Sequence, residues 1–231
     1  MTYTPLRIDF VDPGAICTRT GGNGRHGFKT STAYILLNNE NGFEQPFGPK
    51  CAEHVLGGRE ALRGIPDFTT RDFTSESGEG DQGTGGGSGG GLGGLGASDI
   101  EKARAFAKRY LMLRMERVAD IPGIQSGIKY PPLAKIYAEF QQARELSDDD
   151  VRHIIALEMS PKTPAVYRSN NLLDVYTAYV QINRLIKTVK PGGYLDTLVS
   201  IRDETLLKRL KLSGGQINVA KLKLHPKAFQ G

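Results

Sequence analysis

Tryptophan is absent from this chain of 231 residues, and cysteine occurs only twice. Long hydrophobic runs are missing as well, because no stretch approaches the roughly 20 consecutive apolar residues that cross a bilayer as a helix. The first ten residues have no apolar core of the kind that secretory signal peptides carry. Together with an ordinary 39% of hydrophobic residues, these absences predict a globular protein of the cytoplasm.

The two cysteines, Cys17 and Cys51, lie in the first quarter of the chain, and the histidines His26 and His54 lie near them. A reducing compartment favours thiols or metal thiolates over a disulfide. Two thiolates and two imidazoles are enough for one tetrahedral zinc ion. We therefore predict a structural zinc site with Cys17, His26, Cys51 and His54 as ligands. The alternative is that both cysteines are small core residues and both histidines are surface residues.

The residues around these ligands predict a small β-rich module over residues 1–60. Residues 28–37 and 43–47 are rich in strand-forming side chains, and the Asn- and Gly-containing stretch between them is typical of a hairpin turn. Residues 6–11 predict a further strand. Pro49 is suited to the first position of a helix, whose first turn would project Cys51 from the same face as His54.

A hairpin followed by a helix that begins with metal ligands resembles a treble-clef zinc finger, here over residues 17–57. That family normally opens with a Cys-x-x-Cys knuckle, whereas Cys17 is followed by Thr18, Arg19 and Thr20. His26, beyond a glycine-rich loop, would replace the missing thiolate. The resemblance implies a closed structural site with four protein ligands and no open position for water.

Glycine dominates residues 78–96, where it supplies 12 of 19 residues. Such a segment has almost no apolar surface to offset the entropy of ordering the chain. We therefore predict a flexible linker over residues 61–97, which divides the chain into the β-rich module and a domain over residues 98–231.

Helical periodicity and helix-capping residues predict that residues 98–231 form an all-α domain of five or six helices. The clearest signals are an apolar stripe over residues 99–119 and Ser147 followed by the acidic turn Asp148 to Asp150. Three other helices are expected: one that begins at Pro131, one over residues 172–189 and one over residues 194–212. The predicted fold class is therefore α+β, with a zinc-stabilised module, a glycine-rich linker and an all-α domain.

Positive charge is concentrated after the linker. Residues 98–231 carry 22 Lys and Arg against 14 Asp and Glu, whereas residues 1–97 carry 8 against 11. Residues 205–231 contain six basic residues and no acidic one. A basic face of this kind suits a phosphate backbone or an acidic protein partner.

The candidate nucleic-acid contacts are basic side chains of the helical domain together with two loop tyrosines whose rings could stack on bases. They are Arg104, Lys108, Tyr130, Tyr167, Arg184, Lys187, Lys208, Arg209, Lys211, Lys221 and Lys223. Residues 206–212 and 216–224 also allow a helix-turn-helix, although a less specific phosphate-contacting tail fits the same residues.

Catalytic chemistry finds little support in the sequence. Three consecutive helical carboxylates, Asp148 to Asp150, point in different directions and cannot converge on one ion. Glu53 lies between two predicted zinc ligands, where it could nominally act as the general base of a catalytic zinc site. The nucleobase-deaminase pattern that this arrangement faintly resembles needs a His-x-Glu and a separate Cys-x-x-Cys, and both are missing. We expect no catalytic residues.

These observations predict a non-catalytic, nucleic-acid-binding accessory protein with a structural zinc ion, acting on DNA or RNA. A zinc finger followed by a helical domain is also similar in layout to the zinc-finger large subunit of type IV CRISPR effector complexes. That resemblance implies assembly with protein subunits and guide RNA in a nucleoprotein complex. The alternative is a protein–protein adaptor or inhibitor that engages one partner through two tethered modules.

Overall fold

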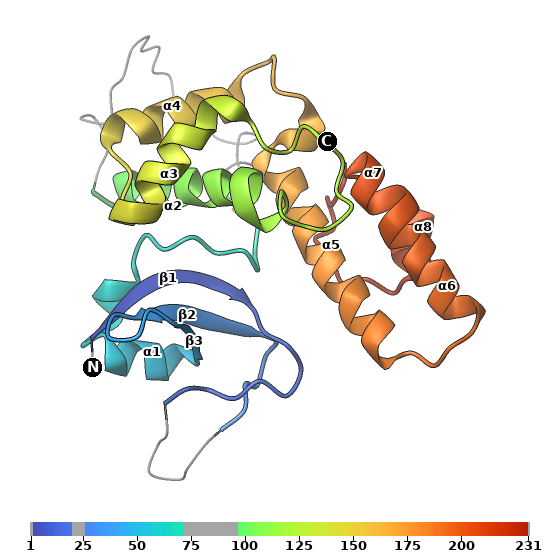
Figure 1. Cartoon of the computed structure of the whole chain (residues 1–231), viewed down its shortest axis with the longest axis horizontal. Helices are drawn as coiled ribbons and strands as arrows, with labels where there is room; N and C mark the ends of the chain where they lie inside the picture. The colour runs from blue at the N-terminus through green and yellow to red at the C-terminus, as the bar shows by residue number, and fades with distance from the viewer. Residues whose placement is uncertain (1, 20–25, 72–96, 231) are drawn as a thin grey trace, which may run out of the picture. The chain divides into compact units, whose positions relative to one another are not determined.

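The computed structural model describes residues 2–19, 26–71 and 97–230. The chain divides into two compact units, Met1–Thr69 and Thr70–Gly231 (Figure 1). The first unit holds a small antiparallel sheet and the second is helical, so the predicted α+β class is confirmed. No helix of the described residues is long and apolar enough to cross a membrane.

The sheet of the first unit has three antiparallel strands in the order β1-β2-β3. Their bounds are β1 Tyr3–Phe10, β2 Thr32–Asn38 and β3 Glu44–Phe47. The predicted hairpin is formed by β2 and β3, with Tyr34 opposite Phe47. Its turn uses the expected chemistry: the Asn38 side chain accepts a hydrogen bond from the Glu40 amide at 2.9 Å, and Gly42 has a φ of 73°.

One face of this sheet packs against helix α1 (Pro49–Val55), which begins at the predicted proline. The buried cluster between them contains Cys17, Leu36, Phe47 and Ala52. Tyr3 adds an edge-to-face contact with Phe47, at 5.2 Å between ring centroids. Burying each large apolar side chain of this kind stabilises the fold by about 1.5–3 kcal/mol. The core of this unit is therefore built directly beside Cys17.

An ion-pair group joins the outer strands of the sheet, with Arg7 and Asp9 buried and Glu44 exposed. Arg7 on β1 contacts Asp9 on the same strand at 2.9 Å and Glu44 on β3 at 2.6 Å. Burial acts to lower the pKa of Arg7, but hydrogen bonds to both carboxylates outweigh this effect and raise it. The guanidinium therefore stays charged and holds the hairpin against β1.

The first unit extends past residue 60, where the sequence analysis placed its end. After the short 3-10 helix η1 (Arg59–Leu62), the chain pairs with the free edge of β1. The Ile8 amide donates to the Pro66 carbonyl at 2.9 Å, and the Phe68 amide donates to the Ile8 carbonyl at 3.0 Å. Phe68 is fully buried. Backbone pairing of this kind leaves no periodic signal in the sequence, which explains why the segment was assigned to the linker.

The remaining residues of the predicted linker divide into two parts. Arg71 belongs to the second unit, where its guanidinium forms an ion pair with Asp174 at 2.7 Å. Residues 72–96, which include the glycine-rich stretch, lie outside the described residues. The described part of the predicted linker, residues 61–71, is thus built into the two units.

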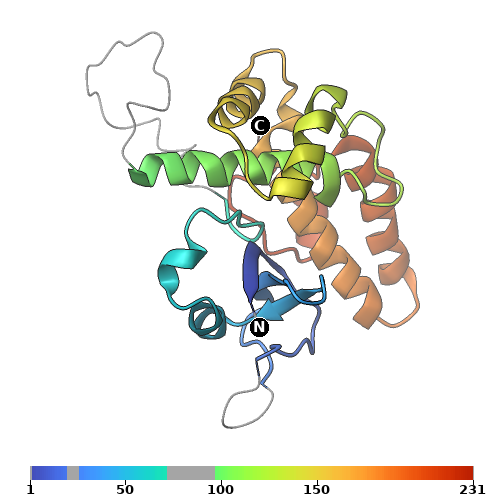
Figure 2. The same cartoon turned by 60° about the vertical axis from the view of Figure 1, so that its left-hand side comes forward.

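The second unit consists of helices joined by short connections, as predicted. The helices are α2 (Ala97–Met112), α3 (Ala134–Ala143), α4 (Asp148–Met159), α5 (Ser169–Thr188), α6 (Gly193–Ser200), α7 (Leu207–Arg209) and α8 (Gly214–Val219). The π-helical turn η4 (Leu113–Arg117) continues α2, and a second one, η7 (Ile201–Leu206), joins α6 to α7. Short 3-10 turns are η5 (Pro131–Leu133) and η6 (Ala165–Tyr167). Helix α4 packs against α2, and α6 lies beside α5 (Figures 1 and 2).

Capping residues explain where two of these helices begin. Ser147 accepts a hydrogen bond from the Asp150 amide at 3.1 Å, so the predicted cap of α4 is confirmed. Ser213 and Gln216 form a reciprocal capping box at the start of α8.

Helix α8 has six residues and is therefore only about 9 Å long. It is too short to serve as the recognition helix of the helix-turn-helix that the sequence allowed.

The interior of the second unit is mainly apolar, and it includes a buried ion pair between Arg71 and Asp174. Its fully buried side chains include Tyr110, Leu111, Leu113, Leu133, Ile154, Leu172, Ile182, Leu198 and Leu206. Asp174 on α5 binds Arg71 and also accepts a hydrogen bond from the Phe229 amide at 3.2 Å. Burial raises the pKa of Asp174, while Arg71 and the Phe229 amide oppose that rise. The Asp174 carboxylate therefore connects both Arg71 and the C-terminal segment to helix α5.

Candidate functional site

Two of the predicted zinc ligands lie at the end of a small hairpin. Ile16 forms an antiparallel bridge with Gly27, and the Cys17 amide donates to the His26 carbonyl at 3.0 Å. The Cys17 thiol points inward and accepts a hydrogen bond from the Gly48 amide at 3.4 Å. Cys17 and His26 are therefore held side by side although eight residues separate them in the chain.

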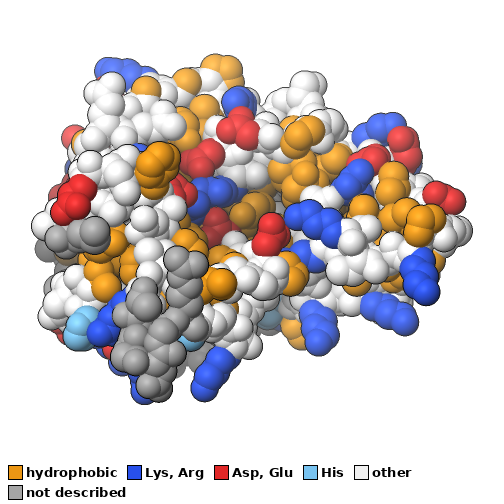
Figure 3. Space-filling view, turned by 60° about the horizontal axis from the view of Figure 1, so that its bottom comes forward, with side chains coloured by type: hydrophobic (Ala, Val, Ile, Leu, Met, Phe, Trp, Pro, Cys, Tyr) orange, Lys and Arg blue, Asp and Glu red, His pale blue; other side chains and the backbone are white. Residues whose placement is uncertain are grey.

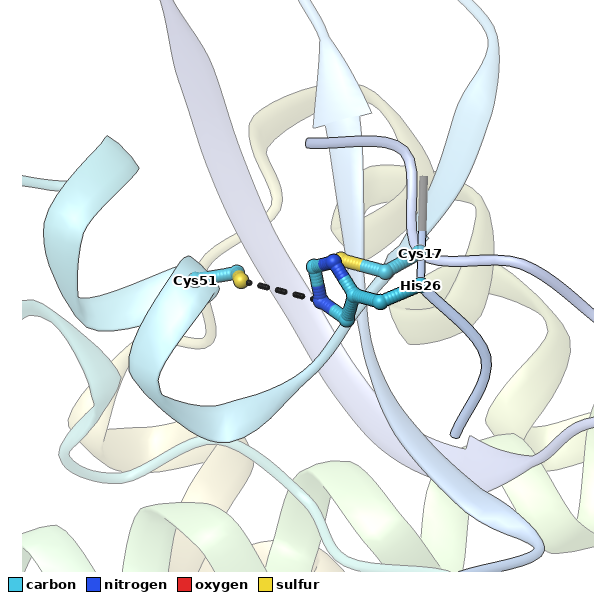
Figure 4. Close-up of side chains that lie close together, drawn as sticks. All are labelled: Cys17, His26 and Cys51. Atoms are coloured by element: carbon cyan, nitrogen blue, oxygen red, sulfur yellow. Dashed lines mark hydrogen bonds between the residues drawn. The ribbon is translucent and has the colours of Figure 1, made fainter. Parts of the chain in front are cut away.

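Cys51, in the first turn of α1, faces this hairpin (Figure 4). Its sulfur lies 3.4 Å from Nε2 of His26. One donor atom from each of Cys17, His26 and Cys51 lies within 4.8 Å of the other two. A tetrahedral zinc ion with bonds of about 2.0–2.3 Å needs donor atoms roughly 3.5–3.8 Å apart. The three side chains therefore lie close enough to one another to hold a metal ion.

The environment of the three donors changes from core to surface. Cys17 is buried in the apolar cluster, Cys51 is half-buried and His26 is exposed. Burial and the nearby Cys17 thiol raise the pKa of Cys51, and the positive charge of Arg19 opposes this rise. A bound metal ion would itself favour the thiolate forms of both cysteines.

His54, the fourth predicted ligand, does not belong to the group. It is exposed, three residues beyond Cys51 on α1, and its ring is not among the donors that lie within 4.8 Å of one another. The spacing was correctly expected to place His54 near Cys51 on the helix. One further turn along α1, however, carries a side chain away from the hairpin that supplies Cys17 and His26.

No protein-family model, curated protein or solved structure matches this chain. The treble-clef and CRISPR resemblances therefore stay predictions from the sequence.

Two of the predicted nucleic-acid contacts are engaged within the protein. Arg104 donates to the Leu146 carbonyl at 2.8 Å and forms an ion pair with Asp148. Lys108 is half-buried, and this burial lowers its pKa, with Glu145 acting in the opposite direction. Arg104 is therefore engaged near the start of α4, and Lys108 is partly shielded from solvent.

Tyr130 and Tyr167, which the sequence analysis expected to stack on bases, each pack against a buried arginine and are half-buried. The guanidinium carbon of Arg114 lies 5.5 Å from the ring centroid of Tyr130 and 4.8 Å from that of Tyr167. Arg114 is only 4% exposed and also lies 5.9 Å from the ring of Tyr110. Its Nε donates to the Ile128 carbonyl at 2.6 Å. Sequence reasoning missed this arginine, although a charged residue within the apolar stripe of a helix was the available signal.

The other predicted contacts differ in exposure. Arg184 on α5 is half-buried, and Lys208 forms an ion pair with Glu204. Exposed basic side chains among the predicted set are Lys187, Lys208, Arg209, Lys211, Lys221 and Lys223. Figure 3 shows Lys and Arg side chains along the right-hand part of the view, which holds helices α5 to α8. The exposed basic residues of the predicted set therefore lie on α5 and α7 and in the segments after α7 and α8, not on α2.

Proposed function

We propose that this protein is a non-catalytic binding protein whose first unit is stabilised by a zinc ion and whose second unit binds nucleic acid. The observation that carries the proposal is the meeting of Cys17, His26 and Cys51 in one place. The chain has only two cysteines and four histidines, and folding brings both cysteines and one histidine together from separate segments. Two sulfur donors and one imidazole are a ligand set that suits zinc.

The zinc ion would connect two parts of the first unit. Cys17 and His26 would hold it from the hairpin, and Cys51 would hold it from α1. A unit of 69 residues has a small core, and a metal ion adds binding free energy that is also folding free energy. The ion would thus have a structural role, because it would cross-link the hairpin to helix α1.

Metal analysis of the purified full-length chain tests this part of the proposal. We expect close to one zinc ion per wild-type chain and almost none in Cys51→Ser or His26→Asn. His54→Ala is the matched control, because His54 lies outside the group, and it should keep its zinc. A wild-type protein that stays metal-free after incubation with zinc would overturn the structural zinc site.

Support for nucleic-acid binding comes from the charge of the second unit. Residues 205–231 carry no acidic residue, and Arg209, Lys211, Lys221 and Lys223 are exposed. Contacts between such side chains and phosphates release counterions, which makes binding weaken as salt rises. DNA and RNA are equally compatible with this contact, as is a place in a larger nucleoprotein complex.

Fluorescence anisotropy with labelled single- and double-stranded DNA and RNA, over a range of salt concentrations, tests the second part. The double variant Lys211→Gln/Lys223→Gln should bind more weakly at low salt and lose about 0.9 in the slope of log K against log salt for each lost contact with duplex DNA. Lys135→Gln is the control, since Lys135 is exposed on α3, outside the basic surface. Undetectable binding at low salt, or binding that salt does not weaken, would refute nucleic-acid binding.

A protein partner is the second candidate. Tyr194 is 38% exposed and Val219 is 50% exposed, and the Tyr194 hydroxyl donates to the Val219 carbonyl at 3.3 Å. These two apolar side chains are therefore neighbours on the surface of the second unit. Co-purification distinguishes the candidates: bound material removed by nuclease favours nucleic acid, whereas a protein that stays bound after nuclease treatment favours the adaptor.

A further inference from the structure

The C-terminal segment that follows helix α8, residues 220–230, contains neither helix nor strand, yet it is fixed along its length. The Leu222 amide donates to the Ile217 carbonyl at 3.0 Å, which ties the start of the segment to α8. Leu222, Ala228 and Phe229 are buried. The basic end of the second unit is therefore a packed part of the structure rather than a free tail.

Side chains of α5 hold the backbone of this segment at two points. Gln181 forms a reciprocal pair with Lys223: its side-chain nitrogen donates to the Lys223 carbonyl, and its side-chain oxygen accepts from the Lys223 amide, both at 2.8 Å. Nearer the end of the chain, Asp174 accepts from the Phe229 amide at 3.2 Å. The pair at Gln181 uses only the backbone of Lys223, so it positions this residue without engaging its ammonium group.

Lysines of the segment face solvent. Lys221 and Lys223 are exposed on either side of the buried Leu222. Two residues of chain span at most about 7 Å, so these lysines are close enough to contact neighbouring phosphates of one strand. Residues 205–231 contain no carboxylate side chain that would compete for them.

An aromatic ring lies at the start of the same segment. The Tyr194 hydroxyl on α6 donates to the Val219 carbonyl at 3.3 Å, two residues before Lys221, and the Tyr194 side chain is exposed. The carboxylate nearest to Tyr194 in the sequence, Asp196, does not share a face of α6 with it. Cations beside an exposed ring suit a single strand, because its unpaired bases offer their faces for stacking while the cations follow the phosphates.

We propose that the second unit binds single-stranded nucleic acid along this C-terminal segment, with phosphates on Lys221 and Lys223 and one base stacked on Tyr194. Gln181 is a positioning residue, because it holds the backbone of Lys223. Lysines that are held in place before binding lose less conformational entropy than those of a free tail, so the same charges bind more tightly. The inference rests on the proposed nucleic-acid binding and adds the class of ligand, the segment that binds it and the role of α5.

Fluorescence anisotropy on the full-length chain tests the ligand, with labelled oligo(dT), oligo(U) and a DNA duplex of the same length as probes. We expect both single strands to bind more tightly than the duplex, and their comparison separates DNA from RNA. Tyr194→Leu keeps an apolar side chain but removes the ring, so it should weaken single-strand binding at least about fivefold and leave duplex binding unchanged. Tyr194→Phe keeps the ring and should bind like the wild type.

The variant Gln181→Ala tests the positioning role. It changes no charge, so the slope of log K against log salt should stay as in the wild type. The affinity for single strands should nevertheless fall about two- to fivefold at every salt concentration, because the segment becomes more mobile before binding. Gln142→Ala, at an exposed glutamine of α3, is the matched control and should bind like the wild type.

The outcomes separate this inference from nucleic-acid binding itself. Unchanged single-strand binding in Tyr194→Leu, or a duplex bound as tightly as the single strands, would overturn the single-strand inference and leave the surface around Tyr194 to a protein partner. Wild-type affinity in Gln181→Ala would show that the segment acts as a free basic tail and overturn the positioning role. Failure of all three probes to bind at low salt would overturn the proposed nucleic-acid binding together with the inference.

Discussion

Replacing Arg114 by lysine removes a planar group that the second unit holds from several sides. Arg114 donates to the Ile128 carbonyl at 2.6 Å, to the Tyr110 hydroxyl at 3.2 Å and to the Gly127 carbonyl at 3.4 Å. A lysine ammonium keeps the charge, but it cannot place donors in these three directions at once.

The expected loss follows from these contacts. A hydrogen bond from a charged donor contributes about 1.5–3 kcal/mol, and we expect lysine to lose one or two of the three. Weaker packing against the rings of Tyr130 and Tyr167 adds to this loss. Arg114→Lys should therefore lower the free energy of unfolding by about 2–4 kcal/mol, out of a typical total of about 5–15 kcal/mol.

Urea unfolding followed by far-ultraviolet circular dichroism measures this change, because the second unit contributes most of the helix. With an m-value of about 2 kcal/mol/M, the unfolding midpoint should fall by about 1–2 M. The control is Arg168→Lys, since Arg168 is an exposed arginine next to Tyr167 and its replacement should change stability by less than about 0.5 kcal/mol. An Arg114→Lys midpoint equal to that of the wild type would refute the idea that the planar guanidinium organises this region.

Three further outcomes are expected. Burial and a 2.7 Å hydrogen bond to Glu116 raise the pKa of Tyr137 above its unfolded value, so wild-type stability should fall as pH rises above about 10, and Tyr137→Phe should flatten this fall in urea titrations at several pH values. Gly42→Ala should cost about 1 kcal/mol because Gly42 has a φ of 73°, whereas Gly48→Ala, at a φ of −67°, should cost little; equal thermal midpoints would contradict this. A chelator should lower the thermal midpoint of the wild-type protein but leave Cys51→Ser unchanged, and a chelator-insensitive wild type would argue against a stabilising metal.

Local signals in the sequence were sufficient for most elements. The hairpin over β2 and β3 was predicted from alternating side chains around a turn, and α1 from Pro49. The start of α4 was predicted from Ser147 and its acidic first turn. Each of these features is fixed by residues within a few positions of one another, so a short stretch of sequence contains the whole cause.

Features that depend on distant partners were missed. The pairing of residues 66–68 with β1 uses backbone groups, which every sequence offers alike. The packing of Tyr130 and Tyr167 on Arg114 was not foreseen, because Arg114 lies on a different segment of the chain. His54 lies at a favourable spacing along α1, but its distance from the Cys17 hairpin depends on how α1 packs against the sheet.

The sequence by itself determined the chemistry that is available to this protein. Its two cysteines and few histidines offer candidate ligands for a metal ion, and its C-terminal residues offer a run of basic side chains. Only the tertiary structure decided which of these residues meet. Cys17 and Cys51 are 34 positions apart, and packing of α1 on the sheet brings them together with His26, while His54 stays on the surface. Ligand geometry depends on such packing, because a metal ion requires its donors within a few ångströms of one another.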